Sequence, residues 1–198
     1  MPTISVIIPT IGRPTLSKVF TTILPQLGFG DEVIVIGDGP TPAAREIVRK
    51  AACPIIKYLE HGPIWNYGNP QRNLGMERAT RRFLMFIDDD DDPIPDGIAT
   101  VRTLIARSPD RPHIFRISVP WGFIPKTRKV SFANVSGQGF IPPNVKGRLG
   151  KWSGRYEGDY DFISGTVAFY GPDAVVWHEE VICHVVPAGR GKIGHDIK

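Results

Sequence analysis

One stretch of the sequence sets the expected fold and chemistry: Phe83-Leu84-Met85-Phe86-Ile87-Asp88-Asp89-Asp90-Asp91-Asp92. Its five consecutive apolar residues predict a β-strand that is buried on both faces and therefore central in a parallel sheet. The five aspartates follow this strand directly and precede Pro93-Ile94-Pro95, so they lie inside the fold. Adjacent carboxylates repel one another unless a cation neutralises them, and hard divalent cations prefer carboxylate oxygens. The stretch therefore predicts a metal site at the end of a buried strand.

The sequence on either side of this stretch alternates between predicted strands and predicted helices. Short runs rich in β-branched residues predict strands, and Pro near the start of a polar-apolar segment favours a helix. The expected strands are 4–8, 32–36, 55–59, 83–87 and 113–119, and the expected helices begin near Pro14, Pro42, Asn69 and Pro95. This alternation predicts an α/β fold with a mostly parallel sheet, whose ligands bind at the carboxyl ends of the strands.

Several polar residues fall at these carboxyl ends. Pro9 and Thr10 follow the first strand, Asp38 follows the second, and Asp88 follows the fourth. Asp38 stands between two glycines, so it fits a turn and equally fits an acceptor for a nucleoside base or ribose. Arg72, in the first turn of the helix that opens at Asn69, is placed to reach a phosphate beside the strand end.

The second half of the chain has a different amino-acid composition. Residues 121–153 are rich in Gly, Pro and basic residues and predict loops or a hairpin over the site, followed by a helix over 159–170 and a strand over 174–186. Neither a repeat nor a long linker divides the chain. We therefore expect a single domain over residues 1–188 and a flexible tail over 189–198.

The charge of the chain is unevenly distributed. Lys and Arg number 24 against 20 acids, which gives +4, and removing the five aspartates of the run leaves 24 − 15 = +9. Between Arg111 and Tyr156 there are nine basic residues and no acidic residue. This basic stretch holds the aromatic residues Trp121, Phe123, Phe132, Phe140 and Trp152. It fits an acceptor site for an anionic polymer, but the favoured interpretation is a hairpin whose aromatic rings pack inward and whose charges are solvated.

Composition excludes several classes of protein. Cys53 and Cys183 are too few for a disulfide framework or a Cys-rich zinc site. The first residues lack a basic segment and a long apolar run, so we expect neither a signal peptide nor a membrane span. We therefore expect a cytoplasmic location. An EF-hand counted from Asp88 would need Gly where Pro93 stands and Glu where Ala99 stands. Neither a dinucleotide-binding glycine motif nor a P-loop is present.

Taken in order, these motifs resemble those of the family 2 glycosyltransferases of the GT-A fold. The motifs are 5–10, 33–39, Arg72-Asn73 and 86–91, and the resemblance covers about residues 3–107. It implies a single GT-A domain in which residues 1–107 bind the nucleotide sugar and residues 108–188 face the acceptor. By resemblance, Pro9, Thr10 and Asp38 hold the nucleotide. The Asp-x-Asp element of the family matches Asp88, which faces the ribose or sugar, and Asp90, which binds Mn²⁺ or Mg²⁺ on the diphosphate; with the register shifted by one residue, Asp89 and Asp91 take these two roles.

The resemblance also implies a catalytic base. The family carries a Glu-Asp pair, whereas this sequence has Gly158-Asp159, so we expect the base to be Asp159, with Asp161 as the alternative. The aromatic surroundings of this segment favour a raised carboxylate pKa. By resemblance, His184 or His178 is a candidate metal ligand, although a lone His on a strand is more often structural. Inversion at the sugar carbon is also implied by resemblance alone.

Two other classes of function remain open at this point. A metal-dependent nuclease or phosphotransferase would use clustered carboxylates, with residues 111–155 holding nucleic acid, but two-metal sites usually gather carboxylates from separate elements. The second class is a non-catalytic module that binds a sugar nucleotide. For a transferase, the expected partner is a nucleotide-diphosphate sugar, and the acceptor is open between a glycan, a small molecule and modified DNA.

Overall fold

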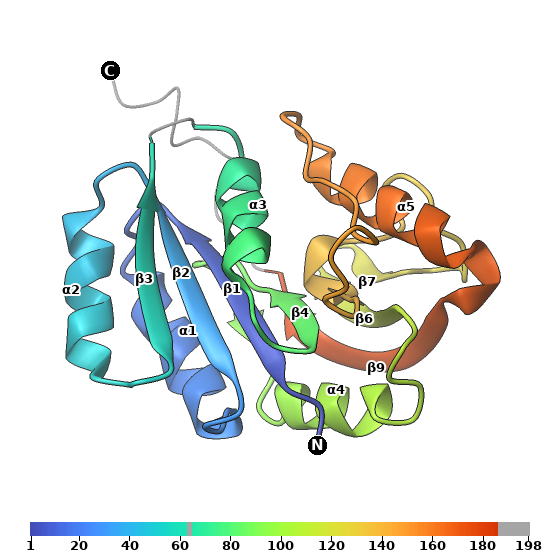
Figure 1. The fold of residues 1–198 in the computed structure, drawn as a ribbon, viewed down its shortest axis with the longest axis horizontal. Coiled ribbons are helices and arrows are strands. Elements are labelled where there is room, and N and C mark those ends of the chain that lie inside the picture. Colours follow the sequence, from blue (N-terminus) through green and yellow to red (C-terminus); the bar gives the residue numbers. More distant parts are fainter. Residues whose placement is uncertain (63–64, 186–198) are drawn as a thin grey trace.

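The computed structural model describes residues 1–62 and 65–185, and its centre is a parallel β-sheet (Figure 1). The sheet has the order β3-β2-β1-β4, formed by β1 (Ile4–Thr10), β2 (Glu32–Asp38), β3 (Ile56–His61) and β4 (Phe83–Phe86). All three pairings are parallel. Every residue of β1, β2 and β4 is buried, as expected for β-branched and apolar strands covered on both faces.

Helices cover the two faces of this sheet. They are α1 (Thr15–Ile23), α2 (Pro42–Ala51), α3 (Asn69–Arg78), α4 (Gly97–Ile105) and α5 (Gly158–Tyr170), with short 3-10 turns at Leu24–Gln26, Gly137–Gly139 and Pro172–Ala174. Because side chains alternate along a strand, β1 divides its residues between two cores. Ile4, Val6 and Ile8 pack with α1 and α4, whereas Ile7 packs with residues of α3 and α5. The result is an α/β/α arrangement in which α3 and α5 share one face.

A second sheet completes the fold, and it corrects one expectation. Its order is β5-β9-β6-β7, formed by β5 (Asp92–Pro93), β9 (Val176–His184), β6 (His113–Val119) and β7 (Gly122–Ile124), and β8 (Phe140–Ile141) pairs with β6. We expected residues 113–119 to continue the parallel sheet. Instead β6 is parallel only to β9 and antiparallel to β7 and β8.

The position of β4 also differs from the prediction. It ends the parallel ladder instead of lying at its centre, since only β1 pairs with it as a neighbouring strand. Its other side meets residues 142–143: Phe83 forms an isolated bridge with Pro143, and Leu84 N donates to Pro142 O at 3.1 Å. This irregular segment buries β4 as completely as a strand would, which explains its uniformly apolar sequence.

The aromatic residues of the basic stretch separate into two groups. Phe140 and Trp152 are buried and pack against Phe162 with ring centroids 5.6 and 5.1 Å from it. Trp121 and Phe132 are 69% and 62% exposed, and Phe123 is exposed as well. The expectation that the aromatic rings pack inward is therefore right for two of the five and wrong for three.

Two expectations concern the ends and the environment of the chain. The tail expected to be flexible, residues 189–198, lies outside the described residues. Across residues 1–62 and 65–185, no helix combines the length and apolar character that a bilayer crossing requires.

Candidate functional site

The carboxyl ends of β1, β2 and β4 place the predicted site residues along one edge of the sheet. Thr10 and Gly37 are register partners, and Ile7 pairs with Phe86, two residues before Asp88. Since the three strands are parallel, Thr10, Asp38 and Asp88 all leave the sheet on the same side. The run of aspartates therefore begins where the strands before it also end.

Three of the five aspartates form a cluster that could hold a cation. Asp88, Asp90 and Asp91 each offer a carboxylate oxygen, and these oxygens lie within 4.8 Å of one another. Asp91 Oδ2 accepts the backbone N–H of Asp88 at 2.9 Å, which closes the loop that brings them together. The arrangement of oxygen ligands is of the kind that Mn²⁺ and Mg²⁺ take.

Electrostatics at this cluster favours the binding of a cation. Burial and the charges of Asp88 and Asp89, against the opposing effect of Arg13, raise the pKa of Asp90 to about 6. Burial and the neighbouring charge of Asp88 also raise the pKa of Asp91. Raised carboxyl pKa values mean that the negative charges are not fully compensated by the protein, so a divalent ion bound there would stabilise the ionised forms.

Asp89 faces away from this cluster, toward the loop that follows β1. Its Oδ2 accepts hydrogen bonds from Thr10 Oγ1 at 2.6 Å and from the Ile11 N–H at 3.3 Å. Its Oδ1 accepts from Arg13 Nη1 at 2.5 Å, and the Asp89 side chain is 1% exposed. Asp89 therefore fastens the β1–α1 loop to the aspartate loop.

Arg72 lies between the aspartate cluster and the second half of the chain. Its Nη2 donates to Asp88 Oδ1, and its Nη1 donates to Tyr67 O at 2.7 Å. The guanidinium carbon lies 4.7 Å from the ring centroid of Trp152, a cation–π geometry. These contacts fix the guanidinium beside Asp88 at the carboxyl edge of the sheet.

Asp159, the expected base, is the second residue of α5. Burial raises its pKa, and the negative charge of Asp88 adds to this effect, while the Tyr160 N–H and the charge of Arg72 lower it. Asp159 Oδ1 accepts the Tyr160 N–H at 2.7 Å. Asp159 is thus a partly buried carboxyl group whose pKa is raised and which interacts electrostatically with Arg72 and Asp88.

The start of α5 is fastened to the start of α3 by Asn69. Asn69 Nδ2 donates to Ser153 O at 2.8 Å and to Arg155 O at 2.9 Å. Its Oδ1 accepts from Arg72 Nη1 at 3.2 Å. A Cβ at Gly158 would lie 2.4 Å from Asn69 Nδ2, which is too close for any side chain. Gly158 therefore allows the two helix starts to meet beside Asp159.

Asp161, the alternative base, is held in a surface ion pair. Arg155 donates to both of its carboxylate oxygens, at 2.7 and 2.5 Å, and Ser153 Oγ donates at 2.5 Å. The hydrogen bonds from Arg155 and Ser153 lower the pKa of Asp161. A carboxylate with a lowered pKa is a weaker base, so the geometry favours Asp159 for proton removal.

The two histidines named as candidate metal ligands are not part of the three-carboxylate group. His184 is exposed at the end of β9, where its backbone pairs with Asp92 and Ser118. In the part of the chain that the structure describes, His184 belongs to no group of three metal-ligating side chains. The ring of His178 stacks on Phe115, with centroids 4.2 Å apart, and accordingly has a structural role.

The residues expected to hold the nucleotide line the neighbouring part of the edge. Asp38 is buried, and its Oδ2 accepts the Trp65 N–H at 3.1 Å. Pro9 lies against the start of α3, since a Cβ at Gly68 would be 2.9 Å from Pro9 Cβ. Pro9 thus borders the start of α3, and Asp38 contacts the segment that precedes it.

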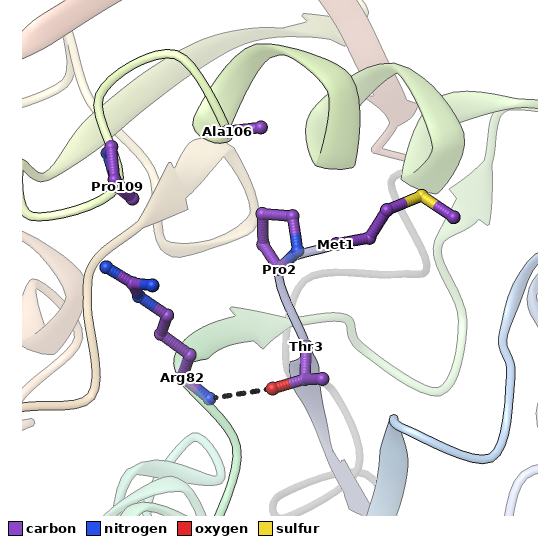
Figure 2. A pocket seen from close by; sticks show the side chains of 6 residues that line it. All are labelled: Met1, Pro2, Thr3, Arg82, Ala106 and Pro109. Atoms are coloured by element: carbon purple, nitrogen blue, oxygen red, sulfur yellow. Dashed lines mark hydrogen bonds between the residues drawn. The ribbon is translucent and has the colours of Figure 1, made fainter.

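A cavity of about 300 Å³ lies far from this site. It is lined by Met1, Pro2, Thr3, Arg82, Ala106 and Pro109, and Figure 2 shows the Arg82 N–H donating to Thr3 Oγ1. These residues flank the amino ends of β1 and β4, which is the edge of the sheet opposite the aspartates. The cavity therefore takes no part in the site described above.

Comparison with known proteins assigns the chain to a family. The family model described as "Glycosyl transferase family 2" matches residues 5–167. The chain belongs to glycosyltransferase family 2. A curated relative is the GalNAc(5)-diNAcBac-PP-undecaprenol beta-1,3-glucosyltransferase of Campylobacter jejuni, 29% identical over 104 residues. That match includes 51% of this chain and 34% of the relative, so the chain spans about a third of its length.

Solved structures of other proteins share the fold. TarS 1-349 of S. aureus has a TM-score of 0.75 at 18% identity, covering 93% of this chain and 61% of that one. The mannosyltransferase PcManGT of Pyrobaculum calidifontis, solved with GDP-Man and Mn²⁺, has a TM-score of 0.71 at 17% identity, covering 96% and 58%. The expected GT-A fold, an α/β fold with a mostly parallel central sheet, is confirmed by these likenesses.

Some residues of this family 2 site were not foreseen from the sequence. Gln138 Nε2 donates to Asp88 Oδ2 at 3.0 Å, and Arg13 Nη1 lies 3.2 Å from Asp90 Oδ2. Arg13 follows the first strand by three residues, so its position at a strand end was a usable signal. Gln138 lies 50 residues after Asp88 in the short 3-10 turn Gly137–Gly139, where no local pattern marks it.

Proposed function

We propose that the chain transfers a sugar from a nucleotide-diphosphate sugar to an acceptor hydroxyl, with the help of a divalent metal ion. The observation that carries this proposal is the Asp88, Asp90 and Asp91 cluster at the carboxyl edge of the sheet, with the partly buried carboxyl of Asp159 on a separate element nearby. Relatives of known structure support the donor class: TarS was solved with UDP and with UDP-GlcNAc, and PcManGT with GDP-Man and Mn²⁺.

The residues present fit a divalent cation. Asp90 and Asp91 would hold the ion together with Asp88, and their raised pKa values indicate charge that a cation would compensate. A bound Mn²⁺ or Mg²⁺ supplies Lewis-acid stabilisation to the negative charge of a departing nucleoside diphosphate. Arg72, held beside Asp88, adds a fixed positive charge at the same edge.

The acceptor side of the reaction falls to Asp159. Its raised pKa and its burial suit removal of the proton from an acceptor hydroxyl as the new glycosidic bond forms. The oxygen of the acceptor would then attack the sugar from the face opposite the diphosphate, in a single displacement with inversion. Asp161, paired with Arg155, would instead keep the segment before α5 in place.

The nucleotide would lie across the first strands. We propose that Pro9 and Asp38 contact the nucleoside, while Thr10 acts through Asp89 to shape the β1–α1 loop. Residues 1–107 would then bind the donor, and residues 108–188, which include Asp159, would face the acceptor. His184 remains a candidate ligand, because its backbone pairs with Asp92, the residue after the cluster residue Asp91, although it is not a member of the group itself.

Donor hydrolysis tests this function directly. Purified protein is incubated with UDP-glucose, UDP-GlcNAc or GDP-mannose and Mn²⁺, and the release of UDP or GDP is measured. The proposal expects slow release with at least one donor, abolished by chelation of the metal. Cleavage of phosphodiesters without donor hydrolysis would support a nuclease or phosphotransferase instead, and binding of a donor without any release would support a non-catalytic module.

The proposal also covers the class of acceptor and the location of the protein in the cell. A hydroxyl on a glycan, on a small molecule or on a modified base would each fit Asp159, and a transfer assay over these three classes separates them. A cytoplasmic location is proposed because nucleotide sugars are the expected substrates, and cell fractionation with detection of the chain tests it.

A further inference from the structure

Gln71, in the first turn of α3, carries a buried side chain that the fold does not use. The residue is 0% exposed, and neither its Nε2 nor its Oε1 has a hydrogen-bond partner. A buried carboxamide without partners is costly, because both its donor and its acceptor lose their bonds to water. Buried polar groups in native proteins are nearly always paired, so an unpaired amide calls for a specific explanation.

The helix places Gln71 beside the predicted nucleoside contacts. A Cβ at Gly75 would lie 2.5 Å from Ile7 Cγ2 and 3.1 Å from Ile36 Cδ1, so α3 packs over β1 and β2 at that level. Gly68, Gln71 and Gly75 are spaced three and four residues apart and share one helix face. Gly68 lies against Pro9, which shows that α3 runs antiparallel to β1.

The level of Gln71 along the strands follows from this packing. Four helical residues rise about 6 Å, and two strand residues rise about 6.6 Å. Gly68 lies against Pro9 and Gly75 against Ile7, so Gln71 lies between the levels of Pro9 and Ile7 on β1. Gln71 thus lies about 4.5 Å, three helical residues, deeper along α3 than the level of Pro9, one of the two residues expected to contact the nucleoside.

We infer that Gln71 recognises the nucleobase of the donor through its carboxamide. This inference rests on the proposed function and adds a specificity-determining residue to it. A carboxamide offers a donor and an acceptor side by side, and the N3–H and O4 of uracil or the N1–H and O6 of guanine present the complementary pair. Since Gln71 is fully buried in the free protein, a base that reaches it displaces neighbouring side chains as it binds.

The substitution Gln71→Leu separates recognition from structure. If the amide serves only a ligand, Leu removes two unsatisfied polar groups, and the melting temperature of the free protein should rise by about 2 °C or more. The affinity for UDP or GDP in Mn²⁺, whichever the wild type binds, should fall about 10-fold or more. Binding of pyrophosphate with Mn²⁺, which has no base, should stay within about twofold of the wild type.

Tyr170→Phe is the matched control. The Tyr170 hydroxyl is also buried without a partner, at the far end of α5, so its removal tests the stability effect away from the site. It should raise the melting temperature without changing nucleotide affinity. Gln71→Met, which keeps the length of the side chain, serves as the second variant if Leu does not pack.

The outcomes distinguish this inference from the function on which it rests. Absence of UDP and GDP binding to the wild type would overturn the proposed donor and the inference together. Wild-type nucleotide affinity in Gln71→Leu, an equal loss of pyrophosphate affinity, or loss of the fold in both Gln71 variants would overturn the role of Gln71 and leave the donor proposal standing. Lower stability with unchanged nucleotide affinity would assign the amide to a buried water.

Discussion

Gly158 and Asn69 meet so closely that a Cβ on the glycine would lie 2.4 Å from the amide nitrogen of the asparagine. The contact joins two helix starts that are about 90 residues apart in sequence, one carrying Arg72 and the other Asp159. The Asn69 amide donates to Ser153 O and Arg155 O, and it could not keep both bonds if a side chain filled the space. The absence of a side chain at position 158 is therefore a requirement of this site's geometry.

Gly158→Ala should move Asp159, the proposed base, away from the carboxyl edge of the sheet where the donor is proposed to bind. The methyl group displaces the Asn69 amide and its two hydrogen bonds, so we expect kcat for donor hydrolysis to fall about 10-fold or more. The affinity for the nucleoside diphosphate should change by less than about threefold, as measured by calorimetry. The double variant Asn69→Ala/Gly158→Ala removes the contact with Asn69 and keeps the one with Ser153 O at 2.9 Å, so Gly158→Ala should cost less in this background than it does alone. Equal effects of Gly158→Ala in both backgrounds would contradict the contact.

Asp159→Asn and Asp161→Asn form a matched pair in the first turn of α5. Asp159→Asn should keep donor affinity and lose about 100-fold or more in turnover, since a positioned general base contributes on that scale. Asp161→Asn breaks the pair with Arg155 at the surface, so it should retain turnover within about fivefold and lower the melting temperature slightly. Steady-state hydrolysis and donor titration check both. Normal turnover by Asp159→Asn would remove Asp159 from the mechanism.

Much of the fold follows from local sequence. The β-branched runs at 4–8 and 32–36 predict the strands that form, and Pro at the starts of α2 and α3 marks both helices. The place of β4 could not be predicted this way. An apolar strand looks the same whether a neighbouring strand or the distant segment around Pro143 covers its outer side.

The roles of individual site residues depended on contacts distant in sequence. The five consecutive aspartates have no local sequence signal that shows which of them points away from the carboxylate cluster. Asp89 is distinguished only by its hydrogen bonds to Thr10 and Arg13. Asn69 fits a helix cap locally, yet its amide bonds to backbone carbonyls 84 and 86 residues later. The sequence was enough to predict which edge of the sheet carries the candidate site. The contacts of each residue along that edge depend on tertiary packing, which the local sequence does not show.

The buried carboxylate of Glu32 should make the stability of the fold sensitive to acid. Burial alone would raise the pKa of Glu32, but hydrogen bonds from Lys57, Thr80 and Ser5 outweigh it and lower the pKa to about 2, from 4.5 when unfolded. The group therefore stabilises the protein fully above pH 4.5, and this contribution of about 3 kcal/mol is lost as the pH falls toward 2.

The substitution Glu32→Gln measures this contribution. Denaturant unfolding between pH 2.5 and 7 should show a wild-type advantage over Glu32→Gln at neutral pH that shrinks steadily below pH 4.5. A difference between the two proteins that stays constant across this range would show that the pKa of Glu32 is not lowered by folding.

The most direct test of the account is the metal dependence of nucleotide binding in two variants from the same run of aspartates. Asp90 belongs to the three-carboxylate cluster, whereas Asp92 lies outside it and pairs with Lys18 at 3.1 Å. With UDP or GDP and Mn²⁺, the wild type and Asp92→Ala should bind with affinities within about twofold of each other, and Asp90→Ala should bind about 10-fold or more weakly. Unchanged metal-dependent binding by Asp90→Ala, or equal losses in both variants, would contradict the metal site on which the proposed glycosyl transfer depends.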